Sequence, residues 1–139
     1  MTVESGSVSF HTHLEGEILD ITEKIQAFVT NGRIKNGVVF LFVPGSTAAL
    51  TTIEFEPGLV ADFPKILERV APKTGSYEHE KQWHDGNGHS HVRASLIGPD
   101  LSVPVRERKL VLGTWQQIVF IELDVRPRER MVVVQLIGD

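Results

Sequence analysis

The 139-residue chain has no cysteine, so it can form neither a disulfide nor a thiolate metal site. Any metal ion must therefore be bound through nitrogen and oxygen atoms, which points to zinc, magnesium or a similar divalent ion. The chain also lacks a block of basic residues, and its net charge is −4. Nucleic acid is therefore not expected as the main partner, because phosphate backbones are bound chiefly by clustered cations.

Long hydrophobic runs are absent as well. No apolar segment approaches the roughly 20 residues that cross a bilayer, and the first ten residues do not join a basic segment to an apolar one. We therefore expect no membrane contact and a cytoplasmic location. A hydrophobic fraction of 41% in 139 residues is sufficient for one domain, residues 1–139, with a core of its own.

Helical periodicity appears twice in the first half of the chain. It predicts one helix over residues 20–31, where Asp20 and Glu23 resemble a capping box. A second apolar stripe runs from residue 59 to 70, and Pro64 suggests that the regular helix starts only at Asp62. The polar segment 73–82 is expected to be a loop, with His79 exposed in it.

Strand-like segments dominate the rest of the sequence. They alternate between apolar and polar residues or are apolar throughout, at 7–13, 38–43, 49–55, 101–105, 109–115, 117–125 and 130–137. The last four follow one another with short turns, which favours antiparallel pairing. We therefore expect an α+β fold: a compact domain of mostly antiparallel, sandwich-like β-sheet with two or three helices.

The stretch from Trp83 to Arg93 gathers His84, His89 and His91, three of the six histidines. Imidazole is the commonest metal ligand among side chains and is suited to proton transfer near neutral pH. The three histidines are therefore candidate ligands of one metal ion. Surface loops also collect histidine, asparagine and glycine without any chemistry, and that interpretation stays open.

Backbone conformation decides what this stretch can do. On an extended backbone His89 and His91 point to the same side and could share a metal. Asn87 is also a plausible N-cap for a helix over residues 88–97, on which the two histidines would diverge by about 200°. In that case a metal would need ligands from elsewhere.

Three further features offer polar groups to a ligand. The turn Gly45-Ser46-Thr47 follows an apolar strand and could donate to a phosphate oxygen, although it could also be an ordinary turn. Glu54, at the end of the next strand, is a candidate metal ligand or base, or else a solvated edge residue. A cluster of Arg126, Arg128 and Arg130 could bind a small anion.

The segment 110–118, Leu-Val-Leu-Gly-Thr-Trp-Gln-Gln-Ile, resembles the signature of the YjbQ-like family (UPF0047), often labelled secondary thiamine-phosphate synthase. The resemblance covers almost the whole chain and implies a compact α+β domain and a homotrimer. Many relatives have histidine at the position of Gly45, so in this chain the role of that imidazole is either absent or taken by another histidine. The other matching positions are 44–50, Glu54, 57–59, Asp62, 87–91, 98–99, 104–105 and 126–130.

The implied reaction joins a hydroxymethylpyrimidine pyrophosphate to a thiazole phosphate and releases pyrophosphate, usually with a divalent metal such as magnesium. By this resemblance His91, Glu54 and His84 are the candidate catalytic residues, and we hypothesise that His91 and Glu54 share one pocket. His84, His89 and His91 are the candidate ligands of Mg or Zn. The candidate residues for binding a small phosphorylated metabolite are Ser46, Thr47, Asn87, Arg93, Trp115, Gln116, Arg126 and Arg128.

Each assignment has an alternative. Trp115 lies in a predicted strand, where tryptophan is more often part of the core than a platform for a ligand. Gln116 could pair across the sheet, and the arginines could form surface ion pairs of little energetic weight. Two other functions stay open: a metal-dependent hydrolase of a phosphorylated metabolite, and a non-catalytic trimer that binds a metabolite or metal.

Overall fold

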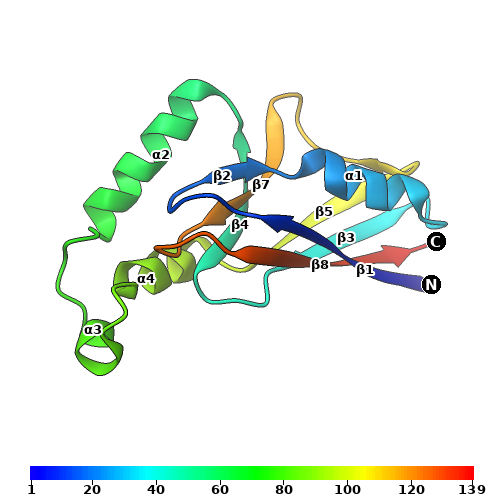
Figure 1. Ribbon diagram of the computed structural model, residues 1–139. Helices are drawn as coiled ribbons and strands as arrows, with labels where there is room; N and C mark the ends of the chain where they lie inside the picture. The colour runs from blue at the N-terminus through cyan, green and yellow to red at the C-terminus, as the bar shows by residue number, and fades with distance from the viewer.

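Two antiparallel sheets form the frame of the protein, described over residues 1–139 by a computed structural model (Figure 1). The five-stranded sheet has the order β1 (Thr2–His11), β8 (Glu129–Gly138), β3 (Gly37–Phe42), β5 (Asp100–Arg106) and β6 (Lys109–Leu110). The three-stranded sheet has the order β2 (Ile18–Asp20), β7 (Gln116–Glu122) and β4 (Ala48–Glu54). The helices are α1 (Thr22–Asn31), α2 (Pro57–Val70), α3 (Glu78–Trp83) and α4 (Gly88–Ile97). The expected α+β class is confirmed, with four helices rather than two or three.

The larger part of the core lies between the sheets and beneath α1. Alternate residues of β8, namely Val132, Val134 and Leu136, are fully buried there, as are Ile25 and Val29 of α1. Since successive side chains of a strand point to opposite faces, position 130 continues the inward-facing row of β8.

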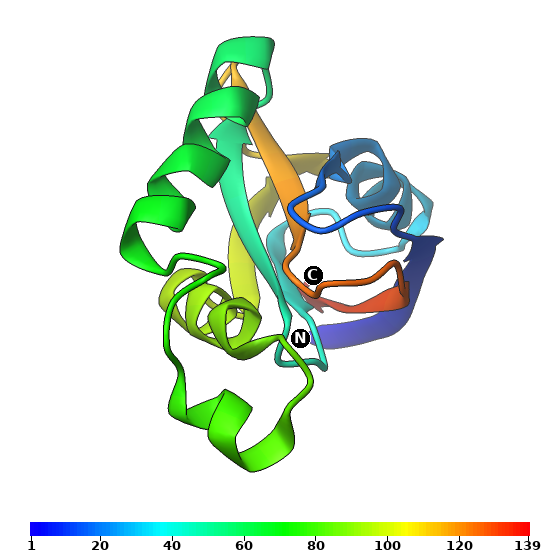
Figure 2. The same cartoon turned by 60° about the vertical axis from the view of Figure 1, so that its left-hand side comes forward.

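The three-stranded sheet is buried on both faces. Ile118 and Phe120 of β7 belong to the core between the sheets, whereas Val119 and Ile121 pack on the opposite side with Ala94 of α4. Figure 2 shows α2 and α4 on that opposite side of β4 and β7. Two-sided burial explains why residues 118–124 are all inaccessible and why the sequence there reads as an almost unbroken apolar run.

Four details of the predicted secondary structure are wrong. Helix α2 begins at Pro57, where the Glu56 carboxylate accepts hydrogen bonds from the Gly58 and Leu59 N–H groups, and Pro64 lies inside the helix. The N-cap of α1 is Ile21, so the Asp20–Glu23 capping box does not form. The segment predicted as a loop contains α3, and β6 ends at Leu110. None of the four helices has the length and apolar character required to span a membrane.

Candidate functional site

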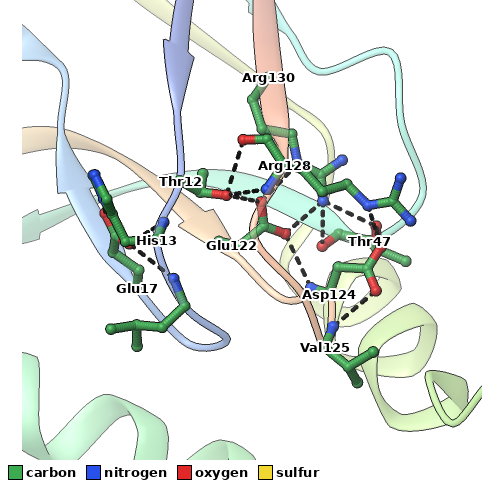
Figure 3. Close-up of polar contacts among 10 residues, drawn as sticks. Thr12, His13, Glu17, Thr47, Glu122, Asp124, Val125, Arg128 and Arg130 are labelled. Atoms are coloured by element: carbon green, nitrogen blue, oxygen red, sulfur yellow. Dashed lines mark hydrogen bonds and ion pairs between the residues drawn. The ribbon is translucent and has the colours of Figure 1, made fainter.

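The core ends at a cluster of charged and hydroxyl side chains, which we call the arginine corner: Thr12, Thr47, Glu122, Asp124, Arg128 and Arg130 (Figure 3). Glu122 continues the row of Ile118 and Phe120 on β7, and Arg130 continues the row of β8 that faces it. The alternation of the two strands therefore directs a carboxylate and a guanidinium into the same interior space.

Glu122 is completely buried and accepts four hydrogen bonds. Arg130 donates from Nε to Oε2 at 2.8 Å and from Nη2 to Oε1, forming a two-pronged ion pair. The Thr12 hydroxyl donates to Oε2 at 2.8 Å, and the Asp124 N–H donates to Oε1 at 3.0 Å. A buried carboxylate requires such compensation, because removal from water strongly disfavours its charge.

Asp124 forms a second ion pair in the corner. Its Oδ2 accepts from Arg128 Nε at 2.6 Å and from the Thr47 hydroxyl at 3.1 Å, and its Oδ1 accepts from the Val125 N–H at 2.7 Å. Burial of Asp124 opposes its ionisation, but the hydrogen bonds from Val125 and Arg128, the Arg128 charge and the Thr47 hydroxyl outweigh it. The pKa of Asp124 therefore lies below its ordinary value.

These pairings leave guanidinium N–H groups without acceptors. Arg130 uses Nε and Nη2, the latter also donating to the Thr47 hydroxyl at 3.0 Å, but its Nη1 makes no hydrogen bond. Arg128 uses only Nε, so both of its terminal nitrogens are free. In Figure 3 the Arg128 guanidinium lies beside the loop that leads into Thr47. The corner can therefore present several fixed donors to an anion.

The histidine stretch forms α4, which confirms the helical alternative with Asn87 as N-cap residue. His89 is buried, at 1% exposure, and its Nε2 pairs with the Glu15 carboxylate, which also accepts from Lys73 Nζ at 2.6 Å. Burial opposes ionisation of Glu15, but the hydrogen bonds and charges of His89 and Lys73 outweigh it and lower its pKa. His89 thus joins α4 to the β1–β2 loop instead of facing a ligand.

His91 is only partly buried and lies on the α4 face that carries Ala94 and Ser95. Its ring lies 4.5 Å from the ring of His79, centroid to centroid. His79 Nε2 is 3.1 Å from Asp85 Oδ1 and 2.9 Å from the side-chain amide of Asn87. With its nitrogen toward Asp85, the Asn87 amide donates to that carboxylate at 2.7 Å. His79, expected to be exposed, is 29% exposed and belongs to this cluster.

The expected three-histidine metal site is not assembled within one chain. His84 is exposed at the C-terminal end of α3 in a left-handed conformation, His89 faces Glu15, and His91 faces His79. No group of three or more histidine, aspartate or glutamate side chains has the geometry of a metal site. The residues present in the single chain therefore do not fit a resident Mg or Zn ion.

Glu54, Trp115 and Gln116 lie at the other end of the three-stranded sheet. In the register of β4 and β7, Glu54 pairs with Gln116, whereas Ala48 pairs with Glu122 at the arginine corner. Six residues of strand separate these ends by about 20 Å. The expected common pocket of His91 and Glu54 is therefore not formed within one chain.

Trp115 is 72% exposed, so the alternative of a core tryptophan is wrong. The Gln116 amide donates to the Thr52 hydroxyl at 2.9 Å and accepts from the Gly113 N–H at 3.0 Å, as expected for pairing across the sheet. Together with Glu54, these residues line a shallow surface depression.

Two other candidate residues have structural contacts. Arg93 is buried and donates to the Ala71 carbonyl at 2.9 Å and to Glu68 at 2.6 Å, so it fastens the end of α2 to α4 rather than facing a phosphate. The Thr47 hydroxyl is engaged inside the corner. By contrast, Ser46 and Arg126 are exposed.

No motif of the sequence marks Thr12, Glu122 or Asp124 as a site residue. Arg130 was visible only as a member of a cationic cluster. The position of Glu122 in the sequence could have indicated its role, because it ends an apolar strand that is too hydrophobic to be exposed. A carboxylate there must have a buried partner.

The fold and the arginine corner define an α+β protein with a candidate anion site at the end of its core. The UPF0047 protein YjbQ-like family model matches residues 6–139, and the chain belongs to this family. A UPF0047 protein of Archaeoglobus fulgidus is 39% identical over 119 residues, covering 86% of this chain and 90% of that protein. One from Methanothermobacter thermautotrophicus is 36% identical over 138 residues, covering 99% and 94%.

Solved structures agree over the full length. A Sulfolobus solfataricus protein, described as YbjQ-like and of unknown function, has a TM-score of 0.89 at 34% identity and covers 99% of this chain and 100% of that chain. A hypothetical protein of Aeropyrum pernix has a TM-score of 0.90 at 33% identity, with coverage of 98% and 99%. The relatives thus establish the family and the fold, and their names assign no reaction.

Proposed function

We propose that this protein binds a small phosphorylated metabolite at the arginine corner. The observation that carries the proposal is the set of unpaired donors on Arg128 and Arg130, whose other nitrogens are fixed by Asp124 and Glu122. Phosphate oxygens are good acceptors for guanidinium groups, and a pre-positioned guanidinium loses little side-chain entropy on binding.

The specific reaction we propose is that of a thiamine-phosphate synthase, as the family resemblance implies. The bond between the pyrimidine methylene carbon and the pyrophosphate oxygen breaks, and its electron pair leaves with pyrophosphate. The thiazole nitrogen then bonds to that carbon and yields thiamine phosphate. Arg128 and Arg130 would stabilise the charge that develops on the leaving group. A magnesium ion would enter with the pyrophosphate, since the single chain offers no set of ligands for it.

His91 is the histidine best placed to act in this reaction. It is partly exposed, whereas His89 is buried against Glu15. Its face of α4 also contributes Ala94 and Ser95 to a cavity next to Gly45 and Ser46. A role for Glu54 in the same chemistry would require a second copy of the chain, because Glu54 lies at the far end of β4.

We also propose a homotrimer. The face of the five-stranded sheet that points away from the core is apolar and uncovered, with Val38, Phe42 and Met131 each 39–43% exposed. Apolar surfaces of this kind on neighbouring strands are typical of contacts between subunits. Light scattering after size exclusion would measure the mass, and a monomer at micromolar concentration would contradict this proposal.

The test of the reaction is thiamine phosphate formation from the two phosphorylated precursors with magnesium. The natural protein is compared with Arg128→Gln and His91→Ala, and Arg106→Gln is the control because Arg106 is exposed and lies at the end of β5 remote from the arginine corner. We expect turnover that falls at least tenfold in the first two variants only. No turnover in the natural protein, with pyrophosphate still bound, would refute the transferase and leave a binding protein.

That second function, metabolite binding without turnover, is favoured by one observation. Both carboxylates of the arginine corner are fully engaged by cations and hydroxyls, so neither is free to act as an acid or base there. The hydrolase alternative needs metal ligands from more than one chain.

A further inference from the structure

Gly45 leaves an open position directly in front of Arg130. A Cβ atom built on Gly45 would lie 3.3 Å from Arg130 Nη1 and 3.8 Å from Val43 Cγ1, and apart from the two chain neighbours no other residue lies within 4 Å of it. That position is therefore empty space bordered by a guanidinium nitrogen and a methyl group. An atom placed there would contact the one Arg130 nitrogen that has no partner.

Backbone geometry does not require glycine at this position. The residues of the chain with positive φ include Gly16, Gly86 and Gly98 but not Gly45. Gly45 donates its N–H to the Val43 carbonyl at 2.9 Å, a contact open to any residue except proline. The absence of a side chain matters here for the space it leaves rather than for the conformation it allows.

Arg130 has the properties of a donor held ready for a ligand. Its side chain is only 10% exposed, and Glu122 and Thr47 occupy its Nε and Nη2. Its Nη1 has no hydrogen-bond partner and is not among the fully buried atoms that lack one, so it reaches solvent and is open to an incoming acceptor. The open position at Gly45 gives such an acceptor access to Nη1.

We propose that the open space in front of the Gly45 Cα is the seat of a phosphate oxygen and that Gly45 determines which ligands the arginine corner accepts. The inference rests on the proposed function. One non-bridging oxygen lies in van der Waals contact with the Gly45 Cα, where a Cβ would block it, and accepts from Arg130 Nη1, while the neighbouring oxygens face Arg128 and the exposed Ser46. A cavity of about 170 Å³ beside the seat accommodates the adjoining part of the ligand, and small residues line it: Gly45, Ser46, Ala48, Ala94, Ser95 and Pro99.

The test is Gly45→Ala, which places one methyl group in the seat and leaves every charged residue unchanged. Binding of inorganic phosphate and of pyrophosphate is measured by isothermal titration calorimetry on the full chain. The matched control is Gly113→Ala, because Gly113 also lacks a positive φ and a Cβ there meets only the Gln116 side chain at 3.6 Å. We expect Gly45→Ala to weaken binding about tenfold to hundredfold, the value of one hydrogen bond to a charged group, and Gly113→Ala to bind like the natural protein.

The outcomes separate the two proposals. If the natural protein binds neither phosphate nor pyrophosphate, the proposed function fails. If it binds them and Gly45→Ala binds equally well, the function stands and the seat at Gly45 is refuted. Equal weakening by both alanine variants would also refute it, because the effect would then be general. Thermal unfolding of each variant without ligand verifies that it is folded.

Discussion

Replacing Glu122 by glutamine should strongly destabilise the protein. The carboxylate is completely buried and accepts from Arg130 twice, from Thr12 and from the Asp124 N–H. The glutamine amide would turn an NH2 group toward at least one of these donors and leave the Arg130 charge without its counterion. Breaking a buried ion pair in this way costs about 3–5 kcal/mol. For a chain of this length that corresponds to a fall in Tm of about 10–17 °C.

Urea unfolding at fixed protein concentration measures this cost from the midpoint and the m-value. The control is Glu129→Gln, since Glu129 is 85% exposed and its pairing with His11 at 3.6 Å should be worth less than about 0.5 kcal/mol. Replacing the whole pair, Glu122→Leu with Arg130→Met, should recover most of the loss, because no buried charge is then left unpaired. A cost below about 1 kcal/mol for Glu122→Gln would refute the assignment of this pair as a buried, mutually dependent unit.

Three further predictions concern the polar contacts of the folded chain. The pKa values of Asp124, Glu15 and Glu17 are lowered in the folded state, so their ionised forms stabilise the fold above the unfolded pKa values near 4, and this stabilisation is lost as the pH falls through the folded values. The Tm should therefore drop between about pH 5 and pH 3. A Tm that does not change over this range would contradict the prediction. The Ser90 hydroxyl is fully buried without a partner, so Ser90→Ala should be neutral or slightly stabilising in urea unfolding, and a loss above about 1 kcal/mol would show that the hydroxyl has a partner. Arg93→Ala should lower the free energy of unfolding by about 2–4 kcal/mol in urea and speed amide hydrogen exchange at the end of α2. Unchanged exchange would disprove that Arg93 holds the end of α2 against α4.

The periodicity of the apolar residues was sufficient to predict the fold class, because these residues follow the strand and helix repeats closely. The alternation of β8 and the two-sided burial of β7 are visible in the sequence. The sequence predicts too late a start for α2, because a glutamate cap is unusual and proline is tolerated mainly in the first turn of a helix. Proline lacks only one N–H, and the rest of the helix outweighs that loss.

The candidate site could be predicted only in part, because its members meet through strand register. Thr12, Thr47 and Glu122 lie in three distant segments, and no spacing rule links them. The histidine stretch is conspicuous for its local density, yet helix geometry directs His89 toward Glu15 and His91 toward His79. Local density indicates reactive residue types, whereas long-range pairing decides which of them face a ligand.

Stability alone does not account for the arginine corner. One buried and one half-buried ion pair at the end of a core are seldom more stabilising than apolar side chains of similar volume, because desolvation offsets most of their attraction. What the two carboxylates achieve is orientation: they hold Arg128 and Arg130 in single positions with unpaired nitrogens remaining. An exposed arginine must lose rotamer entropy when it binds an anion, but a fixed one has already lost it on folding. The ion pairs of the arginine corner thus add little to stability but fix a set of hydrogen-bond donors before any ligand arrives. This is the physical reason to regard the corner as a candidate binding site.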